Sequence, residues 1–366
     1  MPAPPGVPYT GKTFRDYCLG QQTGETTAAQ AAVVDLMSTA VDERDCGAAF
    51  AALQRLEELD LSMKDITTLA PLAGLAALRD LNIAFNDIRD ITPLGTLPAL
   101  EKLNMHSLKA SSLAPLAGST RLVELIATAR AMKDIGAVAR LTKLETLHLE
   151  YVQATDLTPL AGLPALKVLR LGHNRALADL TPLAGLTGLE ELEIGGTTAV
   201  RSLAPLAGLT RLRMLSVEGR GLRDVSAVAG FTELEDLSLQ LAARARLPSL
   251  AGHSKLRDLK LQYGDLTDLG FLTGATTIEE LYLDDNAIAS LEPVRTLTAL
   301  RVLRLTNNEI TDVSPLASLT RLDYLQLEGN PIVADQAHCP ATDVRSGAVA
   351  SFCGAYRQAQ AARPGP

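Results

Sequence analysis

Apolar residues recur along most of this chain in a fixed frame whose first, fourth and sixth positions are hydrophobic. Thirteen such frames follow one another at a spacing of 22 residues, twice 23, and the fourth position is always leucine. The frames begin at Leu56, Leu78, Leu100, Leu122, Leu144, Leu166, Leu189, Leu212, Leu234, Leu256, Ile278, Leu300 and Leu322. Alternation with period two predicts a half-buried strand, and similar units stacked in one direction predict a parallel sheet.

The segment after each strand frame recurs as Pro-Leu-Ala-Gly-Leu or a close variant. Proline stands at the same place in eight of these segments: Pro71, Pro93, Pro115, Pro159, Pro182, Pro205, Pro293 and Pro315. With only about ten residues left for each crossing, we expect single 3-10 turns or very short helices. The unequal lengths of the two sides favour curvature. The expected fold is an α/β solenoid shaped like a horseshoe, with the sheet on its concave face and the returns on its convex face.

The frames resemble the leucine-rich repeat family, specifically the class with 22-residue repeats found in bacterial internalin-like proteins. The resemblance rests on Leu-x-x-Leu-x-Leu, on the downstream Pro-Leu and on the ninth-position asparagines Asn86, Asn174, Asn286, Asn308 and Asn330. It covers residues 56–335, about 12.5 repeats, and implies a scaffold that binds another protein on its concave face. Asparagine at the ninth position would satisfy backbone groups between turns. Because the ninth position is apolar at Leu108, Val152 and Ala242, we expect the middle of the array to be less regular.

Both ends of the array differ in composition from the repeats. Residues 1–13 are rich in proline and glycine and predict a flexible arm, whereas residues 14–55 predict a helical cap with helices at 26–40 and 46–53. Residues 336–366 predict a second helical cap and a tail, with one helix over 342–360. Such caps cover the apolar ends and the unpaired strand groups of a repeat array.

The four cysteines fall two and two in the predicted caps, as Cys18 with Cys46 and Cys339 with Cys353. This distribution predicts one disulfide per cap, where a small core gains most from a crosslink. Neither pair has the Cys-x-x-Cys spacing of a zinc site. The caps resemble the cysteine-bearing caps of exported bacterial repeat proteins, which implies an extracellular, periplasmic or cell-surface location. Four buried thiols in a cytoplasmic protein are the alternative.

Composition narrows the classes of partner. The formal net charge is -8, aromatic residues make up 4% and tryptophan is absent. An acidic chain is a poor match for nucleic acid or for an anionic membrane surface. No apolar window reaches the ~18 residues of a membrane span, so we expect a soluble chain, and a monomer. The first residues show neither a basic nor an apolar leader region, so either a leader has been removed or the protein is cytoplasmic.

Charges alternate down the second position of successive frames. The row reads Glu57, Arg79, Glu101, Val123, Glu145, Lys167, Glu190, Arg213, Glu235, Arg257, Glu279, Arg301, Asp323. Because equal positions of stacked strands lie ~4.8 Å apart, each charge gains opposite neighbours. We interpret this row as a structural ladder; a binding role is the alternative.

The third, fifth, seventh and eighth positions are expected to point into the concave surface. These rows hold fourteen acidic residues against four basic ones. The excess of acids would steer a partner with a basic surface toward this face. The alternative is that the acids only keep a long sheet soluble.

Candidate contact residues lie on the same rows. The aromatic ones are Phe85, Tyr151, Tyr263, Tyr282 and Tyr324, and interface anchors are often aromatic residues or arginine. The first candidate patch is the group Tyr263, Tyr282, Arg304 and Tyr324, beside Asp284 and Asp285.

Three histidines on the concave rows, His106, His148 and His173, invite a metal or catalytic interpretation. His148 and His173 would be three residues out of register on adjacent strands, ~10 Å apart, too far for one ion. Arg170, the expected neighbour of His148, also disfavours a cation. We therefore expect histidines that contact solvent or a partner.

No sequence motif indicates a catalytic or cofactor site. The Asp284 and Asp285 pair lacks the spacing of a calcium loop, and no phosphate loop or catalytic triad appears. The leading hypothesis is thus a non-enzymatic protein-binding scaffold without cofactor or metal. Its alternatives are a cytoplasmic adaptor or regulator of the same fold, and a hydrolase whose convergent groups the rows do not supply.

Overall fold

The computed structural model describes residues 11–153, 155–197, 199–243, 245–340, 342 and 344–361. Residues 1–10 of the predicted arm and 362–366 of the predicted tail lie outside the described residues. The chain divides between Asn174 and Arg175 into two compact units, called the first and the second unit.

Each repeat contributes one short strand, and within each unit the strands run parallel in chain order. The first unit holds β1 (Glu58–Asp60), β2 (Asp80–Asn82), β3 (Lys102–Asn104), β4 (Glu124–Ile126), β5 (Thr146–His148) and β6 (Val168–Arg170). The second unit holds β7 (Glu191–Ile194), β8 (Met214–Leu222), β9 (Asp236–Leu241), β10 (Asp258–Lys260), β11 (Glu280–Tyr282), β12 (Val302–Arg304) and β13 (Tyr324–Gln326). Leu81 pairs with Leu103, one period of 22 residues later, so equal repeat positions lie side by side as predicted.

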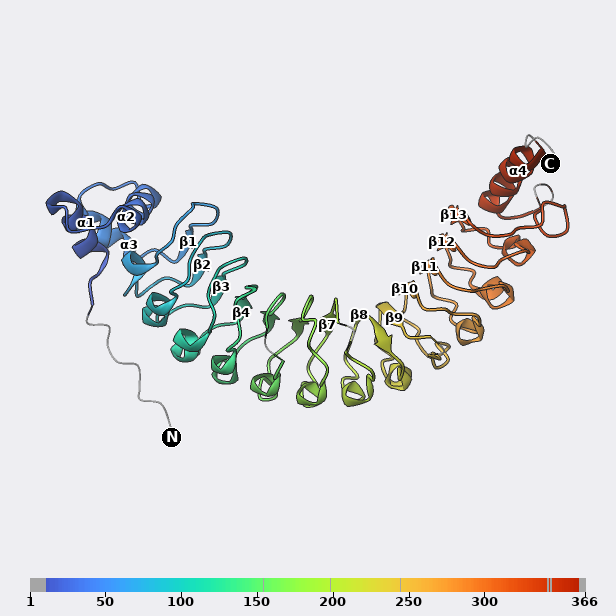
Figure 1. Ribbon diagram of the computed structural model, residues 1–366, viewed down its shortest axis with the longest axis horizontal. Coiled ribbons are helices and arrows are strands. Elements are labelled where there is room, and N and C mark those ends of the chain that lie inside the picture. The colour runs from blue at the N-terminus through green and yellow to red at the C-terminus, as the bar shows by residue number, and fades with distance from the viewer. Residues whose placement is uncertain are drawn as a thin grey trace. The chain divides into compact units, whose positions relative to one another are not determined.

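Short 3-10 helices return the chain, as the proline-containing segments predict. In the first unit they are η1 (Ala70–Leu72), η2 (Thr92–Thr96), η3 (Ala114–Gly118), η4 (Gly136–Arg140) and η5 (Thr158–Leu160). In the second unit they are η6 (Thr181–Leu183), η7 (Ala204–Leu206), η8 (Ser226–Gly230), η9 (Gly270–Leu272), η10 (Glu292–Thr296) and η11 (Ser314–Leu316). In each unit the strands line one side and these turns the other (Figure 1). Each predicted proline occupies the first turn of its helix, where its missing N–H costs nothing.

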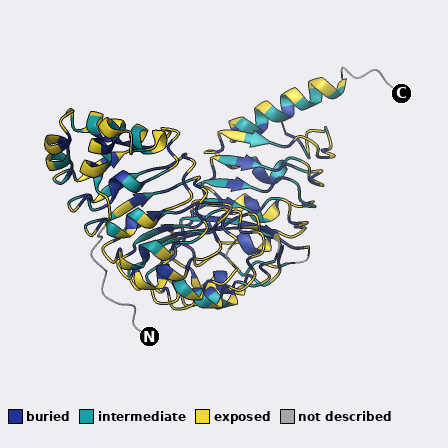
Figure 2. Ribbon diagram, turned by 60° about the vertical axis from the view of Figure 1, so that its left-hand side comes forward, coloured by how far each residue is buried: buried dark blue, intermediate teal, exposed yellow. Residues whose placement is uncertain are grey.

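The core is a stack of leucines between strands and returns. Leu81, Leu147 and Leu281, at the fourth positions of three repeats, are fully buried. Buried residues alternate with half-buried ones along the strands (Figure 2). Stacked aliphatic layers explain how a chain with only 4% aromatic residues forms a core.

The ninth-position asparagines form the expected ladder of hydrogen bonds. The Nδ2 atom of Asn308 donates to the carbonyl oxygens of Leu283 and Leu305 at 3.0 Å each. Its Oδ1 accepts the N–H of Ile288 at 3.1 Å. Asn86, Asn286 and Asn330 make equivalent contacts. One amide thus satisfies backbone groups of two successive turns that lie away from water.

The ladder is interrupted where the ninth position is not asparagine, as predicted. There β8 runs on to Leu222, and its pairing with β9 shifts register between Val217 and Leu222. The N–H of Ala242 donates to the carbonyl oxygen of Leu222 at 2.7 Å. Backbone pairing thus continues between these two repeats beyond the point where the ladder asparagine stands elsewhere.

Opposite charges meet along the second position, as the alternation predicts. Arg79 lies 3.2 Å from Glu101 and 3.7 Å from Glu57. Similar pairs join Lys167 with Glu145, Arg213 with Glu235, Arg257 with Glu279 and Arg301 with Asp323. At the interruption, Arg121 reaches Glu101 at 2.7 Å and lowers the pKa of that carboxyl by its hydrogen bond. Because these pairs are exposed, water and salt screen them, and each adds little to the stability of the fold.

Three helices form the N-terminal cap: α1 (Phe14–Thr23), α2 (Ala28–Ala40) and α3 (Cys46–Leu53). The α3 bounds equal the predicted ones, and Thr27 caps α2 by accepting the N–H of Gln30. The sequence did not reveal α1, a short and polar helix. A disulfide between Cys18 and Cys46, with Cα atoms 5.7 Å apart, ties α1 to α3 and confirms the predicted pairing.

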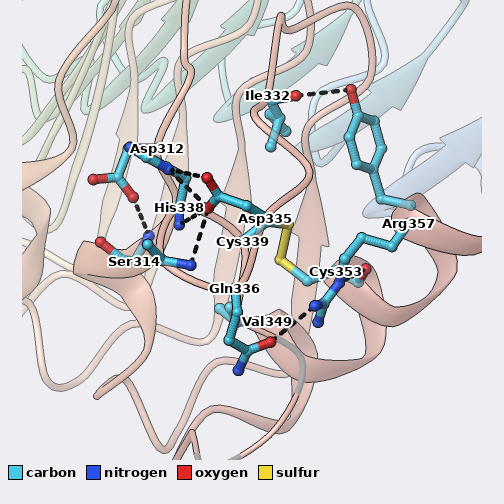
Figure 3. Close-up of a disulfide and its surroundings, with 12 residues drawn as sticks. Asp312, Ser314, Ile332, Asp335, Gln336, His338, Cys339, Val349, Cys353 and Arg357 are labelled. Atoms are coloured by element: carbon cyan, nitrogen blue, oxygen red, sulfur yellow. Dashed lines mark hydrogen bonds and ion pairs between the residues drawn. A yellow bond between two sulfur atoms is a disulfide. The ribbon is translucent and has the colours of Figure 1, made fainter. Parts of the chain in front are cut away.

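The C-terminal cap is α4 (Gly347–Ala361), held by the predicted disulfide between Cys339 and Cys353 (Figure 3). The predicted start of this helix at residue 342 is wrong. Ser346 ends the preceding segment, since its hydroxyl accepts the N–H of Val349 and its carbonyl that of Ala350. Nearby, the hydrogen bond that His338 donates to the Asp335 carboxylate raises the pKa of His338.

The helices within the described ranges are all too short or too polar to cross a membrane.

Candidate functional site

Side chains at the third and fifth positions of each repeat lie on the strands and form one surface of the sheet, called the strand face. Their alternation with buried leucines exposes them in part, as at Glu280 and Tyr282 on β11. Register aligns Tyr282 directly with Arg304 on the next strand. Residues at the same repeat position therefore form continuous rows across this surface.

Tyr282 is the centre of a polar and aromatic group on the second unit. Its ring lies 5.7 Å from Lys260 Nζ and 5.9 Å from the Arg304 guanidinium carbon. Its hydroxyl donates to Glu280 at 2.6 Å. This hydrogen bond, together with burial, raises the pKa of Tyr282 to about 12. The phenol thus stays neutral and is held between two cations.

Tyr263 and Tyr324 lie on the same unit, and both are exposed. Tyr324 lies on β13, where it pairs with Val302 of β12. Tyr263 follows β10, and the Arg220 guanidinium lies 5.5 Å from its ring centroid. The predicted end patch therefore has its aromatic members on the second unit.

Asp284 is not the exposed contact residue that its seventh position predicts. Its side chain is only 4% exposed, and it forms an ion pair with Arg304 at 3.1 Å. It also accepts the N–H of Thr306 at 2.9 Å and the amide of Gln262 at 2.7 Å. Asp284 therefore orients Arg304 from below the surface, whereas Asp285 remains half-buried at the turn.

Three carboxylates stand side by side on β9, β10 and β11, at Asp236, Asp258 and Glu280. Burial and the neighbouring carboxylates raise the pKa of Asp258. Lys260 offsets part of this charge through an ion pair of 3.1 Å with Asp236. The strand face is accordingly acidic beside the Tyr282 group.

The eighth position, just after each strand, adopts left-handed backbone in most repeats. At this position Phe85, Tyr151, His173 and Tyr263 have φ values of 57°, 57°, 61° and 59°. Left-handed backbone costs an L-residue roughly 1–2 kcal/mol, and glycine or asparagine avoids part of that cost. Large rings kept at strained and exposed positions point to a role outside the fold itself.

The rings of the first unit lie in two contacting pairs. Tyr151 and His173 stack with centroids 4.2 Å apart, and Phe85 meets His106 at 4.9 Å. The Arg130 guanidinium lies 5.6 Å from the Tyr151 ring. Sequence rows predicted the rings, but not that an arginine of the preceding repeat would reach one of them.

His148 pairs in register with Arg170, as predicted. The parts of the chain that the structure describes contain no group of three or more His, Cys, Asp and Glu residues placed to hold a metal ion. The three predicted histidines are thus distributed over separate contacts: His106 with Phe85, His148 beside Arg170, and His173 on Tyr151.

Comparison with known proteins gives the family. A family model described as "Leucine Rich repeats (2 copies)" matches residues 298–337. No curated protein matches the chain. A solved structure, an internalin (InlF) from Listeria monocytogenes, is similar with a TM-score of 0.77 and 25% identity, over 86% of this chain and 94% of that one. The chain is a leucine-rich repeat protein, internalin-like in structure.

Two further solved structures share this leucine-rich repeat fold. One is a leucine-rich repeat protein of Leptospira interrogans, with a TM-score of 0.65 and 20% identity over 78% of this chain and 87% of that one. The other is the functional domain of InlJ from Listeria monocytogenes, which includes a cysteine ladder. It has a TM-score of 0.56 and 21% identity over 76% of this chain and 64% of that one. Scaffolds of this fold are typically protein-binding and non-catalytic.

Two arginines depart from the leucine-rich repeat pattern in the same way. Arg130 and Arg220 take the ninth position, where the repeat favours asparagine, and each lies over a tyrosine at a later eighth position. One such pair belongs to each unit. The signal that could have found them is an arginine at the ninth position upstream of a tyrosine at the eighth.

Proposed function

We propose that this protein is a non-enzymatic recognition scaffold that binds a protein partner through its strand face. The observation that carries the proposal is the Tyr282 ring, held between Lys260 and Arg304, with the exposed Tyr263 and Tyr324 on the same unit. Aromatic residues and arginine supply most of the affinity in protein interfaces, and rings fixed by their neighbours lose little entropy on binding.

The partner that suits this surface has a basic region. In the third, fifth, seventh and eighth positions, the second unit carries nine acidic residues against two basic ones, and the first unit five against two. Asp284 is discounted because Arg304 neutralises it. A basic partner would be attracted to the remaining carboxylates and steered toward the tyrosines.

The tyrosines provide the test. The partner is first identified by crosslinking and mass spectrometry in the native organism. Tyr282→Ala combined with Tyr324→Ala is then expected to lower affinity for that partner at least tenfold, because two anchors are lost. The midpoint of thermal unfolding should stay unchanged, since both residues lie on the solvent side of the sheet. The measurement is calorimetric or interferometric titration.

A matched control replaces two exposed apolar residues that lie outside the strands. Leu19 and Val333 are 44% and 40% exposed, and alanine at both positions should leave the affinity unchanged. Equal affinity of the tyrosine variant and the parent protein would move the binding site away from this patch.

We further propose an extracytoplasmic, exported bacterial protein, with a cytoplasmic adaptor or regulator as the alternative. The two cap disulfides support export because cysteines in reducing compartments stay as free thiols. Intact-mass measurement of native material, alkylated with and without reductant, should show two bridges. Four free thiols in that material would favour the cytoplasmic alternative.

A further inference from the structure

A hollow of about 500 Å³ lies beside the ends of β3, β4 and β5 in the first unit. Its lining residues are His106, Ser107, Leu108, Lys109, Thr128, Arg130, Ala131 and Tyr151. None of them is acidic, although the chain as a whole has a net charge of -8. Other surface hollows in the described chain, one in the N-terminal cap and two on the strand face, each include at least two carboxylates. This hollow is therefore chemically distinct from them.

The hollow arises from small residues in one turn. After β4 the chain reads Ala-Thr-Ala-Arg-Ala-Met, so Ala129 stands where the repeats on either side place Ser107 and Tyr151. Ala129 is buried and begins a tight turn, which Met132 closes by donating its N–H to the Ala129 carbonyl at 2.9 Å.

Arg130 is the cation best placed to meet an anion in this space. Its residue is exposed, its guanidinium lies over the Tyr151 ring, and no carboxylate within the described ranges pairs with it. Tyr151 is fixed in turn by stacking on His173. Lys109 is the second cation, although Asp87 already contacts it at 2.6 Å. Within the described part of the chain, no ion pair offsets the charge that Arg130 brings to the hollow.

Hydrogen-bond donors complete the lining. Thr128 Oγ1 accepts the N–H of Ser107 at 3.1 Å and lies 2.7 Å from His106 Nδ1. When the threonine hydroxyl donates to Nδ1, the ring N–H of His106 is on Nε2. His106 then presents a donor, and its ring also packs on the exposed Phe85. The Arg130 cation and the His106 donor suit a carboxylate, and the rings of Tyr151 and Phe85 suit an aromatic residue next to it in the ligand.

We propose that this hollow binds an acidic side chain from an extended segment of a protein partner, with Arg130 as its principal contact. The inference rests on the proposed function and deepens it, because it adds a second contact of opposite charge to the acidic strand face of the second unit. A partner would then present both a basic region and an acidic segment, and the charge order along the array would fix its direction.

The test uses short peptides and the full chain. With ¹³C-labelled histidine, the protein gives five imidazole signals, and His106→Gln assigns one of them. Acetyl-Gly-Glu-Tyr-Glu-Gly-amide is expected to shift the His106 signal at millimolar concentration, and the peptide with Gln in place of Glu to bind about tenfold more weakly. Arg130→Gln should weaken the acidic peptide about tenfold.

Arg220→Gln is the matched control, since Arg220 also lies over a tyrosine but in the second unit. It should change the affinity less than twofold. The inference is overturned if the acidic peptide leaves His106 unshifted, if both peptides bind equally, or if Arg220→Gln weakens binding as much as Arg130→Gln. The variant with alanine at Tyr282 and Tyr324 should keep its peptide affinity, so this result and the partner measurement can fail separately.

Discussion

Replacing Asn308 with alanine is expected to lower the free energy of unfolding by about 3 kcal/mol. Asn308 is 6% exposed, and its amide serves the carbonyls of Leu283 and Leu305 and the N–H of Ile288. Alanine leaves these three backbone groups without a partner in a region with little access to water. Urea unfolding followed by circular dichroism measures the loss, and hydrogen exchange at the Ile288 amide locates it.

The adjacent Asn307 is the control. It is exposed, its φ of 56° is left-handed, and its side-chain amide donates to Asp285 at 2.8 Å rather than to the buried backbone. Asn307→Gly relieves the backbone but loosens the unfolded chain, so the net change should stay within about 0.5 kcal/mol. Similar losses in the two variants would show that the ladder amide is not what stabilises this segment.

Loss of the Cys18–Cys46 bridge is expected to destabilise the N-terminal cap by about 3.5 kcal/mol. The estimate comes from the entropy of closing a loop across 28 residues; the Cys339–Cys353 bridge, across 14, gives about 3 kcal/mol. In the variant with serine at Cys18 and Cys46, the cap should open at lower temperature and expose the edge of β1. Exchange at the Leu61 amide, which bonds the Asn82 carbonyl at 2.8 Å, reports that opening.

Serine at Cys339 and Cys353 is the companion variant. Because each repeat contacts only its neighbours, this variant should loosen α4 and leave the Leu61 amide protected. Faster exchange at Leu61 in the C-terminal variant, or unchanged exchange in the N-terminal one, would contradict the assignment of each bridge to its own cap.

The sequence predicts the repeats well because a strict period leaves one register. A strand that slipped by one residue would expose the leucine at the fourth position of its repeat. The strands β1 to β13 therefore lie within the first residues of the frames. The caps lack such a period. Helix α1 forms because Phe14 is buried and Cys18 is bridged, which are tertiary facts, and α4 starts late because Ser346 caps it.

The sequence predicts the candidate surface only where the strand register alone decides which side chains are neighbours. The rows correctly place Tyr282 beside Arg304. They do not reveal that Asp284 turns inward to Arg304, that Tyr151 stands on left-handed backbone, or that Arg130 reaches it. Each of these depends on how one turn bends relative to the next, and a repeat average conceals such differences.

The alternating ladder of the second position also restricts how such an array can change in length. Each glutamate there stands next to an arginine or lysine, as with Glu235 beside Arg213. Removing one repeat from inside an alternating stretch, such as the repeat of Arg257, would bring two residues of the same sign together, whereas removing two successive repeats there would preserve the alternation. The ladder therefore favours recombination that adds or removes two repeats at a time. Such a change keeps residues of opposite charge on neighbouring strands.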